Sequence, residues 1–198
     1  MILILAIIAG VICLDQLTKW LAVIYLQGEA SFPLWKDVLH FTYSENTGMA
    51  FGMMKDQRWV FMVLSTVAIV GLLVYLFIFR PKSRWMQIAM AMIVGGGIGN
   101  MIDRIALGYV IDFIDFTLID FAIFNVADSF VCVGAGILIV YLLADILEDA
   151  KKEKKLAAEQ AVAEEFAEEV GEESAEEFGE EVGEESAKTS AEETDHDE

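Results

Sequence analysis

Carboxylates, amides and a few basic side chains recur within and beside long apolar runs of this sequence. The segments that carry them are LDQLTK with Asp15 and Lys19, ENTGMAFG with Asn46, GGGIGNMIDR with Asn100, Asp103 and Arg104, GYVIDFIDF with Asp112 and Asp115, Asp120 alone, and FNVADS with Asn125 and Asp128. Ionisable groups inside apolar segments cost free energy, so each needs a structural or a chemical reason. Two carboxylates that approach one another in a low dielectric share one proton. Such a pair can hydrolyse a peptide, because one carboxylate activates a water while the other donates to the carbonyl oxygen.

Other hydrolytic mechanisms lack their parts in this sequence. It contains no GxSxG and no HExxH, and His40 and His196 are its only histidines. Cys13 and Cys132 both lie within apolar runs, where we expect them to be small buried apolar side chains. Two such cysteines make neither a disulfide framework nor a metal site. The sequence therefore predicts aspartic chemistry without a metal or another cofactor.

Two of the charged segments have a structural interpretation. Asp15 and Lys19 are four residues apart, the spacing of an ion pair on one face of a helix. Asp103 adjoins Arg104, which favours an ion pair at the end of an apolar run. We therefore expect both pairs to anchor helices.

The remaining carboxylates leave the choice of a catalytic pair open. Asp115 and Asp120 lie in an apolar loop and are expected to be solvated. Asp112 and Asp128 have apolar neighbours and no adjacent cation. They are the leading candidates for a dyad, although residue types alone do not exclude the other aspartates.

The elements that must position these groups are membrane helices. Hydrophobic residues make up 56% of the chain, and the mean hydropathy is +0.51. The apolar residues form four blocks, at about 1–26, 60–79, 86–106 and 124–147. Each block is near the ~20 residues that a helix needs to cross the hydrocarbon core. The fold class expected is thus an all-α integral membrane protein of four transmembrane helices, with the first block retained as a helix.

The distribution of lysine and arginine predicts the orientation of these helices. Segment 80–84 has three bases in five residues, and segment 151–155 has four, whereas 107–123 has none. Basic segments favour the cytoplasmic side, so both termini should be cytoplasmic and loops 27–57 and 107–123 external. Residues 37–43 alternate apolar and polar side chains and are rich in β-formers, which predicts a small extracytoplasmic β-rich element.

This topology brings carboxylates to one depth. Asp128 lies about four residues into the fourth block, roughly 6 Å below the outer surface at ~1.5 Å per residue. Asp103 lies near the external end of the third block, and Asp112 follows in the external loop. We therefore expect a site just beneath the outer leaflet.

Four glycines, Gly95, Gly96, Gly97 and Gly99, stand in the third block. Small residues in membrane helices usually permit close packing of neighbouring helices. A face that receives a substrate helix is the alternative interpretation.

The chain is expected to divide into a transmembrane domain, 1–150, and a tail, 151–198, that begins with a basic anchor. The formal net charge is −19, but the tail alone has 19 acids and 5 bases, a net of −14. Segments 164–175 and 176–187 repeat the pattern EEFxEEVGEESA. Dense like charge without core-forming residues predicts a disordered acidic tail. Because basic residues occur only in short clusters, nucleic-acid binding has no electrostatic basis.

Five motifs, in the same order and spacing, resemble those of lipoprotein signal peptidase, also called signal peptidase II: LDQLTK, ENTGMAFG, GGGIGNMIDR, GYVIDF and FNVADS. The resemblance covers residues 1 to about 147. It implies that Asp112 and Asp128 are the catalytic dyad. It further implies that Asn46, Asn100, Arg104 and Asn125 orient the substrate, and that Asp15, Lys19 and Asp103 support the site.

The resemblance also implies the substrate and the location. The family cleaves signal peptides from diacylglyceryl-modified prolipoproteins just before the lipidated cysteine, in the bacterial cell (inner) membrane. Membrane lipids are then the other partner. A small proton- or cation-coupled transporter is the alternative, but the chain has no recognisable inverted repeat and its carboxylates gather at one depth. A non-catalytic membrane scaffold is a third possibility.

Overall fold

The structure, a computed structural model, describes residues 1–48, 58–119 and 121–193. Its elements are α1 (Ile2–Leu26), β1 (Phe32–Trp35), β2 (Leu39–Asn46), α2 (Arg58–Val74), the π-helix η2 (Tyr75–Phe79), α3 (Arg84–Ala106), β3 (Val110–Asp115), the 3-10 helix η3 (Thr117–Ile119) and α4 (Val126–Glu193). The chain divides into two compact units, Met1–Leu143 and Ala144–Glu198. Asp120 and residues 49–52 of the ENTGMAFG motif lie outside the described residues.

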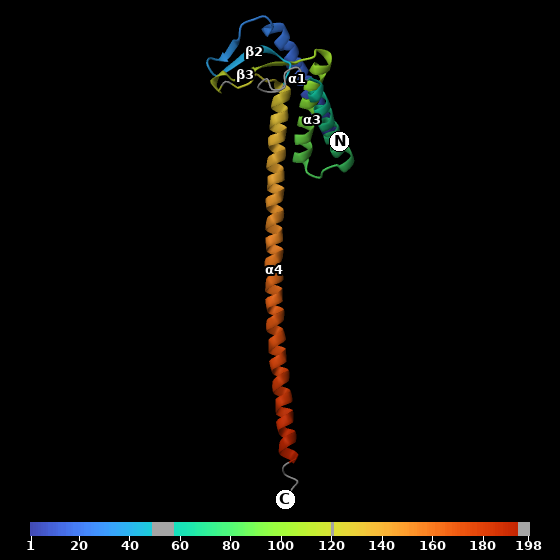
Figure 1. Cartoon of the computed structure of the whole chain (residues 1–198), viewed down its shortest axis with the longest axis vertical. Helices are drawn as coiled ribbons and strands as arrows, with labels where there is room; N and C mark the ends of the chain where they lie inside the picture. Colours follow the sequence, from blue (N-terminus) through green and yellow to red (C-terminus); the bar gives the residue numbers. More distant parts are fainter. Residues whose placement is uncertain (49–57, 120, 194–198) are drawn as a thin grey trace. The chain divides into compact units, whose positions relative to one another are not determined.

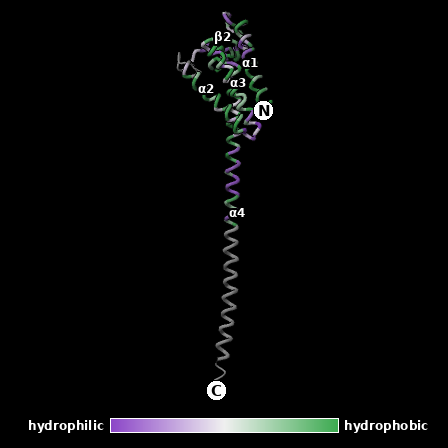
Figure 2. Tube along the Cα trace, turned by 90° about the vertical axis from the view of Figure 1, so that its right-hand side faces the viewer, coloured by the Kyte–Doolittle hydropathy of each residue, from purple (hydrophilic) through white to green (hydrophobic). Residues whose placement is uncertain are grey.

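Among the described residues, four helical stretches are long and apolar enough to cross a membrane. They are Ile2–Leu26, Met62–Phe79, Arg84–Ala106 and Val126–Val162. The expectation of four such helices is confirmed, with bounds a few residues from those expected except at the end of the fourth. Only 6% of the apolar window in Met62–Phe79 is buried within the protein, so its apolar surface needs a lipid environment. Figure 2 shows hydrophobic colour over much of the helical bundle.

Three antiparallel strands form a sheet in the order β1-β2-β3. The sheet lies beside the C-terminal end of α1 (Figure 1). Strand β2 confirms the β-rich element expected around residues 37–43. Strand β3 corrects the expectation that residues 107–123 form only a loop. It pairs with β2 through Asn46↔Val110 and Ser44↔Asp112, a partner far away in sequence that no local pattern reveals.

The glycines of α3 lie where neighbouring helices come closest. A Cβ added at Gly95 would lie 2.8 Å from Val11 Cβ, and one added at Gly96 would lie 2.5 Å from Ala127 O. A Cβ added at Gly97 would lie 3.2 Å from Ile69 Cδ1, and one added at Gly99 would lie 2.5 Å from Asp15 Oδ2. These contacts come from α1, α4 and α2, so the chain's own helices occupy the positions around α3. Close packing accounts for the glycines without a substrate helix.

Helix α4 extends to Glu193 and therefore includes the segment for which the sequence predicts disorder. Alanine, glutamate and lysine, which fill much of residues 151–193, have high helix propensity, and no proline interrupts them. Along α4, Figure 2 changes from hydrophobic to hydrophilic colour after the apolar turns. A boundary between domains at residue 150 stays a prediction.

Candidate active site

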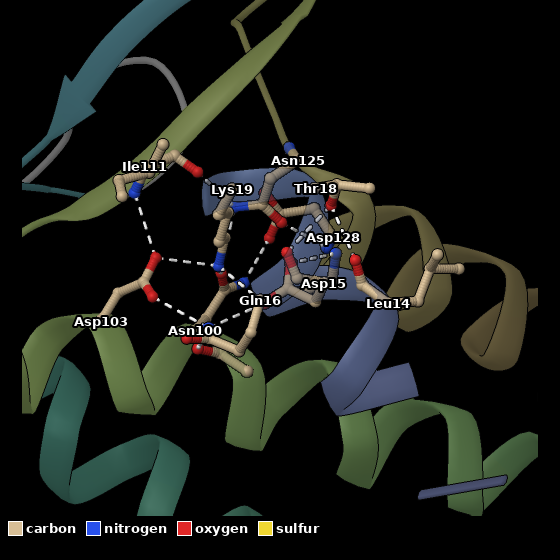
Figure 3. Close-up of polar contacts among 12 residues, drawn as sticks. Leu14, Asp15, Gln16, Thr18, Lys19, Asn100, Asp103, Ile111, Asn125 and Asp128 are labelled. Atoms are coloured by element: carbon tan, nitrogen blue, oxygen red, sulfur yellow. Dashed lines mark hydrogen bonds and ion pairs between the residues drawn. The ribbon is translucent and has the colours of Figure 1, made fainter. Parts of the chain in front are cut away.

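The polar residues singled out in the sequence come together where α1, α3, β3 and the first turn of α4 meet (Figure 3). Six of them are buried: Asp15, Lys19, Asn100, Asp103, Asp112 and Asn125. Buried polar groups are costly unless they are hydrogen-bonded or paired. Their partners therefore show how the cluster is built.

Lys19 is the centre of a buried ion cluster between α1 and α3. Its Nζ lies 2.9 Å from Asp15 Oδ2 and 2.9 Å from Asp103 Oδ2. The expected pair of Asp15 with Lys19 is confirmed. The expected pair of Asp103 with Arg104 is wrong within the described residues, where Asp103 pairs with Lys19 instead. Adjacent residues on a helix point in different directions, which explains why they do not meet.

The two carboxylates of this cluster also hold the segments that carry the other aspartates. Asp15 Oδ1 accepts the backbone N–H of Ala127 at 3.0 Å, which satisfies a free donor in the first turn of α4. Asp103 Oδ2 accepts the backbone N–H of Ile111 in β3 at 3.2 Å. The ion cluster thus fixes the residues that immediately precede Asp128 and Asp112.

Three asparagine amides donate to Asp112 and Asp128. Asn46 Nδ2 donates to Asp112 Oδ2 at 2.8 Å, and Asn125 Nδ2 donates to Asp112 Oδ1 at 2.7 Å. Asn100 Nδ2 donates to Asp128 Oδ1 at 2.8 Å. The backbone N–H of Asn125 also donates to Asp128 Oδ2 at 3.3 Å. Neutral donors hold these carboxylates without neutralising them.

Asp112 and Asp128 line the same cavity, of about 420 Å³. Asn46, Asn100 and Arg104 line it as well, and its other walls include apolar side chains such as Val110 and Phe124. Arg104 Nη1 donates to Asn100 O at 3.3 Å, which places the guanidinium beside the cavity. Among the described residues, the lining of the cavity therefore combines two carboxylates, peptide-like donors and one cation.

Asn125 lies behind the cavity wall, whereas a residue that orients a substrate would have to face the cavity. It is fully buried and is not among the residues that line the cavity. Its amide contacts Asp112, Asn100 and the Ile111 carbonyl from behind the carboxylates. This geometry favours a role in holding the carboxylates over a role in orienting a substrate.

Burial raises the pKa of Asp112 from its usual value near 3.8 to about 6. The donation from Asn46 lowers the pKa, the negative charge of Asp128 raises it, and the donation from Asn125 lowers it again. Desolvation is the largest contribution, since the charged form loses water contacts. Asp112 therefore holds its proton closer to neutral pH than an ordinary aspartate does.

Three features were missed or misjudged in the sequence. Cys13 and Cys132, which were expected to be buried, are both exposed on the surface of the protein. Gln16 Nε2 donates to Asp103 Oδ1 at 3.0 Å and to Gly99 O at 3.2 Å, so Gln16 joins α1 to α3. Its place between Asp15 and Lys19 was the only local signal. Asp115, expected to be solvated, is half-buried and accepts a hydrogen bond from Thr42 Oγ1 at 2.8 Å. In the part of the chain that the structure describes, no group of three His, Cys, Asp or Glu could hold a metal ion.

Comparison with known proteins identifies the family. A family model described as Signal peptidase (SPase) II matches residues 7–144. The chain belongs to the signal peptidase II family. A lipoprotein signal peptidase from Brevibacillus brevis is 42% identical over 146 residues, which are 74% of this chain and 95% of that protein. One from Caldanaerobacter subterraneus is 49% identical over 134 residues, 68% of this chain and 91% of that protein.

A solved structure also resembles this signal peptidase II chain. It is described as a bacterial membrane enzyme, is 30% identical, and superposes with a TM-score of 0.68 over 72% of this chain and 88% of that one. The family match at residues 7–144 includes all five motifs on which the resemblance was based. The resemblance is thus confirmed.

Proposed function

We propose that this chain is an aspartic endopeptidase that cleaves the signal peptide from diacylglyceryl-modified prolipoproteins just before the lipidated cysteine. Asp112 and Asp128 form its catalytic dyad, and no metal or cofactor takes part. The observation that carries the proposal is that both carboxylates line one cavity and are held there by neutral amide donors. Family membership supplies the substrate class.

The two carboxylates have different environments, which supports different roles. Asp112 is 1% exposed and has a raised pKa, so it carries the shared proton. Asp128 is half-buried and more accessible to a water molecule in the cavity, so it acts as the general base. Environments that separate the proton affinities of two carboxyl groups are the usual basis of such a division.

The reaction then proceeds by general acid–base catalysis. Asp128 takes a proton from water while the new C–O bond forms at the scissile carbonyl, and Asp112 donates its proton to the carbonyl oxygen. The C–N bond of the tetrahedral intermediate breaks as a proton passes from Asp128 to the amine nitrogen, and a hydroxyl group of the intermediate returns its proton to Asp112. The products are the signal peptide with a new carboxyl terminus and the lipoprotein with a free amino group on its cysteine.

Amide and guanidinium groups of the cavity wall are available to a peptide backbone. We assign substrate orientation to Asn46, Asn100 and Arg104, whose side chains line the cavity beside the dyad. Asn125 supports the dyad from behind. Asp15, Lys19 and Asp103 support the site through their contacts with Ala127, Asn100 and Ile111.

The membrane itself is part of the proposal. Both termini and segment 80–84 lie in the cytoplasm, and the dyad lies just beneath the outer leaflet of the bacterial cell membrane. At this depth the acyl chains of the substrate stay in lipid while the bond before the cysteine reaches the cavity. The residues beyond about 160 are solvated, form no part of the site, and are not needed for cleavage.

The test is cleavage of a synthetic diacylglyceryl-modified precursor peptide by purified protein in detergent, with products identified by mass spectrometry. Asp112→Asn and Asp128→Asn, which are nearly isosteric but cannot hold or take the proton, should each lower turnover at least ~1,000-fold. Asp115→Asn is the matched control, because Asp115 lies on the same strand but does not line the cavity. Near-wild-type turnover by either dyad variant would refute the assignment of Asp112 and Asp128 as the dyad. A peptide left uncut by the wild-type protein would refute the proposed function.

A further inference from the structure

Each of the three amides around the dyad is held in one orientation by a donor to its oxygen. Asn46 Oδ1 accepts the backbone N–H of Gly48 at 3.0 Å, and Asn125 Oδ1 accepts the backbone N–H of Asp128 at 2.9 Å. Asn100 Oδ1 accepts from Lys19 Nζ at 2.9 Å and from Asn125 Nδ2 at 3.0 Å. In every case the amide nitrogen is left facing a carboxylate.

The orientation of the Asn100 amide has direct consequences for Asp128. With its oxygen toward Lys19, the amide presents Nδ2 to Asp128 Oδ1 at 2.8 Å. After a rotation of 180°, oxygen would face the carboxylate oxygen of Asp128, and Nδ2 would face the ammonium of Lys19. Lysine has donors and no acceptor, so that alternative loses the hydrogen bonds to Lys19 and Asp128, and the one from Asn125 as well.

Lys19 is well suited to this task because its own position is fully determined. Its ammonium has three hydrogens, and Asp15, Asp103 and Asn100 supply three acceptors, each at 2.9 Å. The side chain is 2% exposed. It is not among the residues that line the cavity, so it does not contact a substrate there.

The positive charge of Lys19 lowers the pKa of Asp112, but it is offset by the carboxylates beside it. Two carboxylates, Asp15 and Asp103, lie against the single ammonium, so the three groups together are not positive. The contact that Lys19 makes toward the dyad is the one to the neutral amide of Asn100. Its influence on Asp128 therefore passes through the orientation of that amide.

We propose that Lys19 is a positioning residue for the peptidase reaction, one that fixes the Asn100 amide so that it donates to Asp128. This inference rests on the proposed function. It gives Lys19 a role that differs from a simple link between α1 and α3. A simple link would affect stability in the same way whatever residue stood at position 100.

The decisive experiment is a double-mutant cycle on the full-length protein, with kcat and KM measured on the diacylglyceryl-modified precursor peptide. Its members are the wild type, Lys19→Met, Asn100→Ala and the double variant. If Lys19 acts through Asn100, Lys19→Met should lower kcat ~10- to 100-fold in the wild-type background and no more than ~3-fold in the Asn100→Ala background. Equal losses in both backgrounds would overturn the proposal.

Gln16→Ala is the matched control. Gln16 joins the same two helices and contacts Asp15 and Asp103, as Lys19 does, but it makes no hydrogen bond to Asn100. Its effect on the melting temperature and on kcat should be the same in the wild-type and the Asn100→Ala backgrounds, and coupling as large as that of Lys19 would also contradict the proposal.

A second variant covers the case in which Lys19→Met fails to fold with Asp15 and Asp103 unpaired. Lys19→Met/Asp15→Asn removes a positive and a negative charge together, and the same cycle is then measured with Asn100→Ala. A loss of kcat that depends on Asn100 supports the proposal, and one that does not refutes it. Failure of the proposed function is distinguishable, because the wild-type protein would then leave the peptide uncut.

Discussion

Replacing Gly96 by alanine should disturb the dyad although Gly96 touches neither aspartate. A Cβ at this position would lie 2.5 Å from the backbone oxygen of Ala127 and 2.8 Å from Val131 Cγ2. Ala127 immediately precedes Asp128, and its N–H is held by Asp15. The main-chain oxygen cannot rotate away as a side chain would, so α4 must move relative to α3.

The size of the effect follows from the contact. An ordinary contact of a Cβ begins near 3.4 Å, so the atoms must separate by about 0.9 Å. Overpacking of this kind costs about 1–3 kcal/mol, partly offset by up to about 1 kcal/mol of improved helix propensity. A displacement near 1 Å at a catalytic group can lower the rate ~100-fold. We therefore expect a larger loss in kcat/KM than in stability.

Gly97→Ala is the appropriate control. It lies next to Gly96 on the same helix and gains the same helix propensity, but its new Cβ meets only side-chain carbons of Ile69, at 3.2 Å. Thermal unfolding in detergent and cleavage of the modified precursor peptide should be measured for both variants. If Gly96→Ala cleaves as fast as Gly97→Ala, the reasoning about the contact between α3 and α4 is refuted.

Three further predictions concern the site, the orientation and the tail. The shared proton should be lost as pH rises through about 6, the raised pKa of Asp112, so kcat/KM of the free enzyme should fall there. Asn46→Ala removes a donor to ionised Asp112 and should therefore move this limb of the pH profile to higher pH. With both native cysteines replaced, Thr117→Cys but not Ser83→Cys should react with a membrane-impermeant thiol reagent in intact cells, and the reverse would invert the topology. Removal of residues 160–198 should leave cleavage in membranes within about twofold at matched expression, whereas a severalfold loss would show that the tail acts on the enzyme.

The four helices could be predicted because the thickness of a bilayer dictates the length of an apolar run. Their bounds depend on the ends of those runs, which the sequence shows directly. Strand β2 could be predicted from its alternating pattern, whereas β3 could not. Residues 110–113 are buried on both faces, so they show no alternation, and their partner strand lies more than sixty residues earlier.

The assembly of the site was only partly predictable for a similar reason. The pair of Asp15 with Lys19 follows from helical spacing. The pair of Lys19 with Asp103 joins two helices that are distant in sequence, and the adjacent Arg104 was a misleading neighbour. Gln16 gave only the weak signal of its place between Asp15 and Lys19, because a glutamine in a membrane helix has many possible partners.

The pairing of charges provides the physical reason to choose Asp112 and Asp128 over the other aspartates. Asp15 and Asp103 each accept an ammonium hydrogen of Lys19 and a backbone N–H, and neither lines the cavity. A carboxylate held in this way is engaged in structural contacts between helices and strands. Asp112 and Asp128 receive donors that carry no charge, and both line the cavity. Contact with a water and a carbonyl oxygen in the cavity is therefore open to Asp112 and Asp128 and not to Asp15 and Asp103, a distinction that depends on the direction of each side chain.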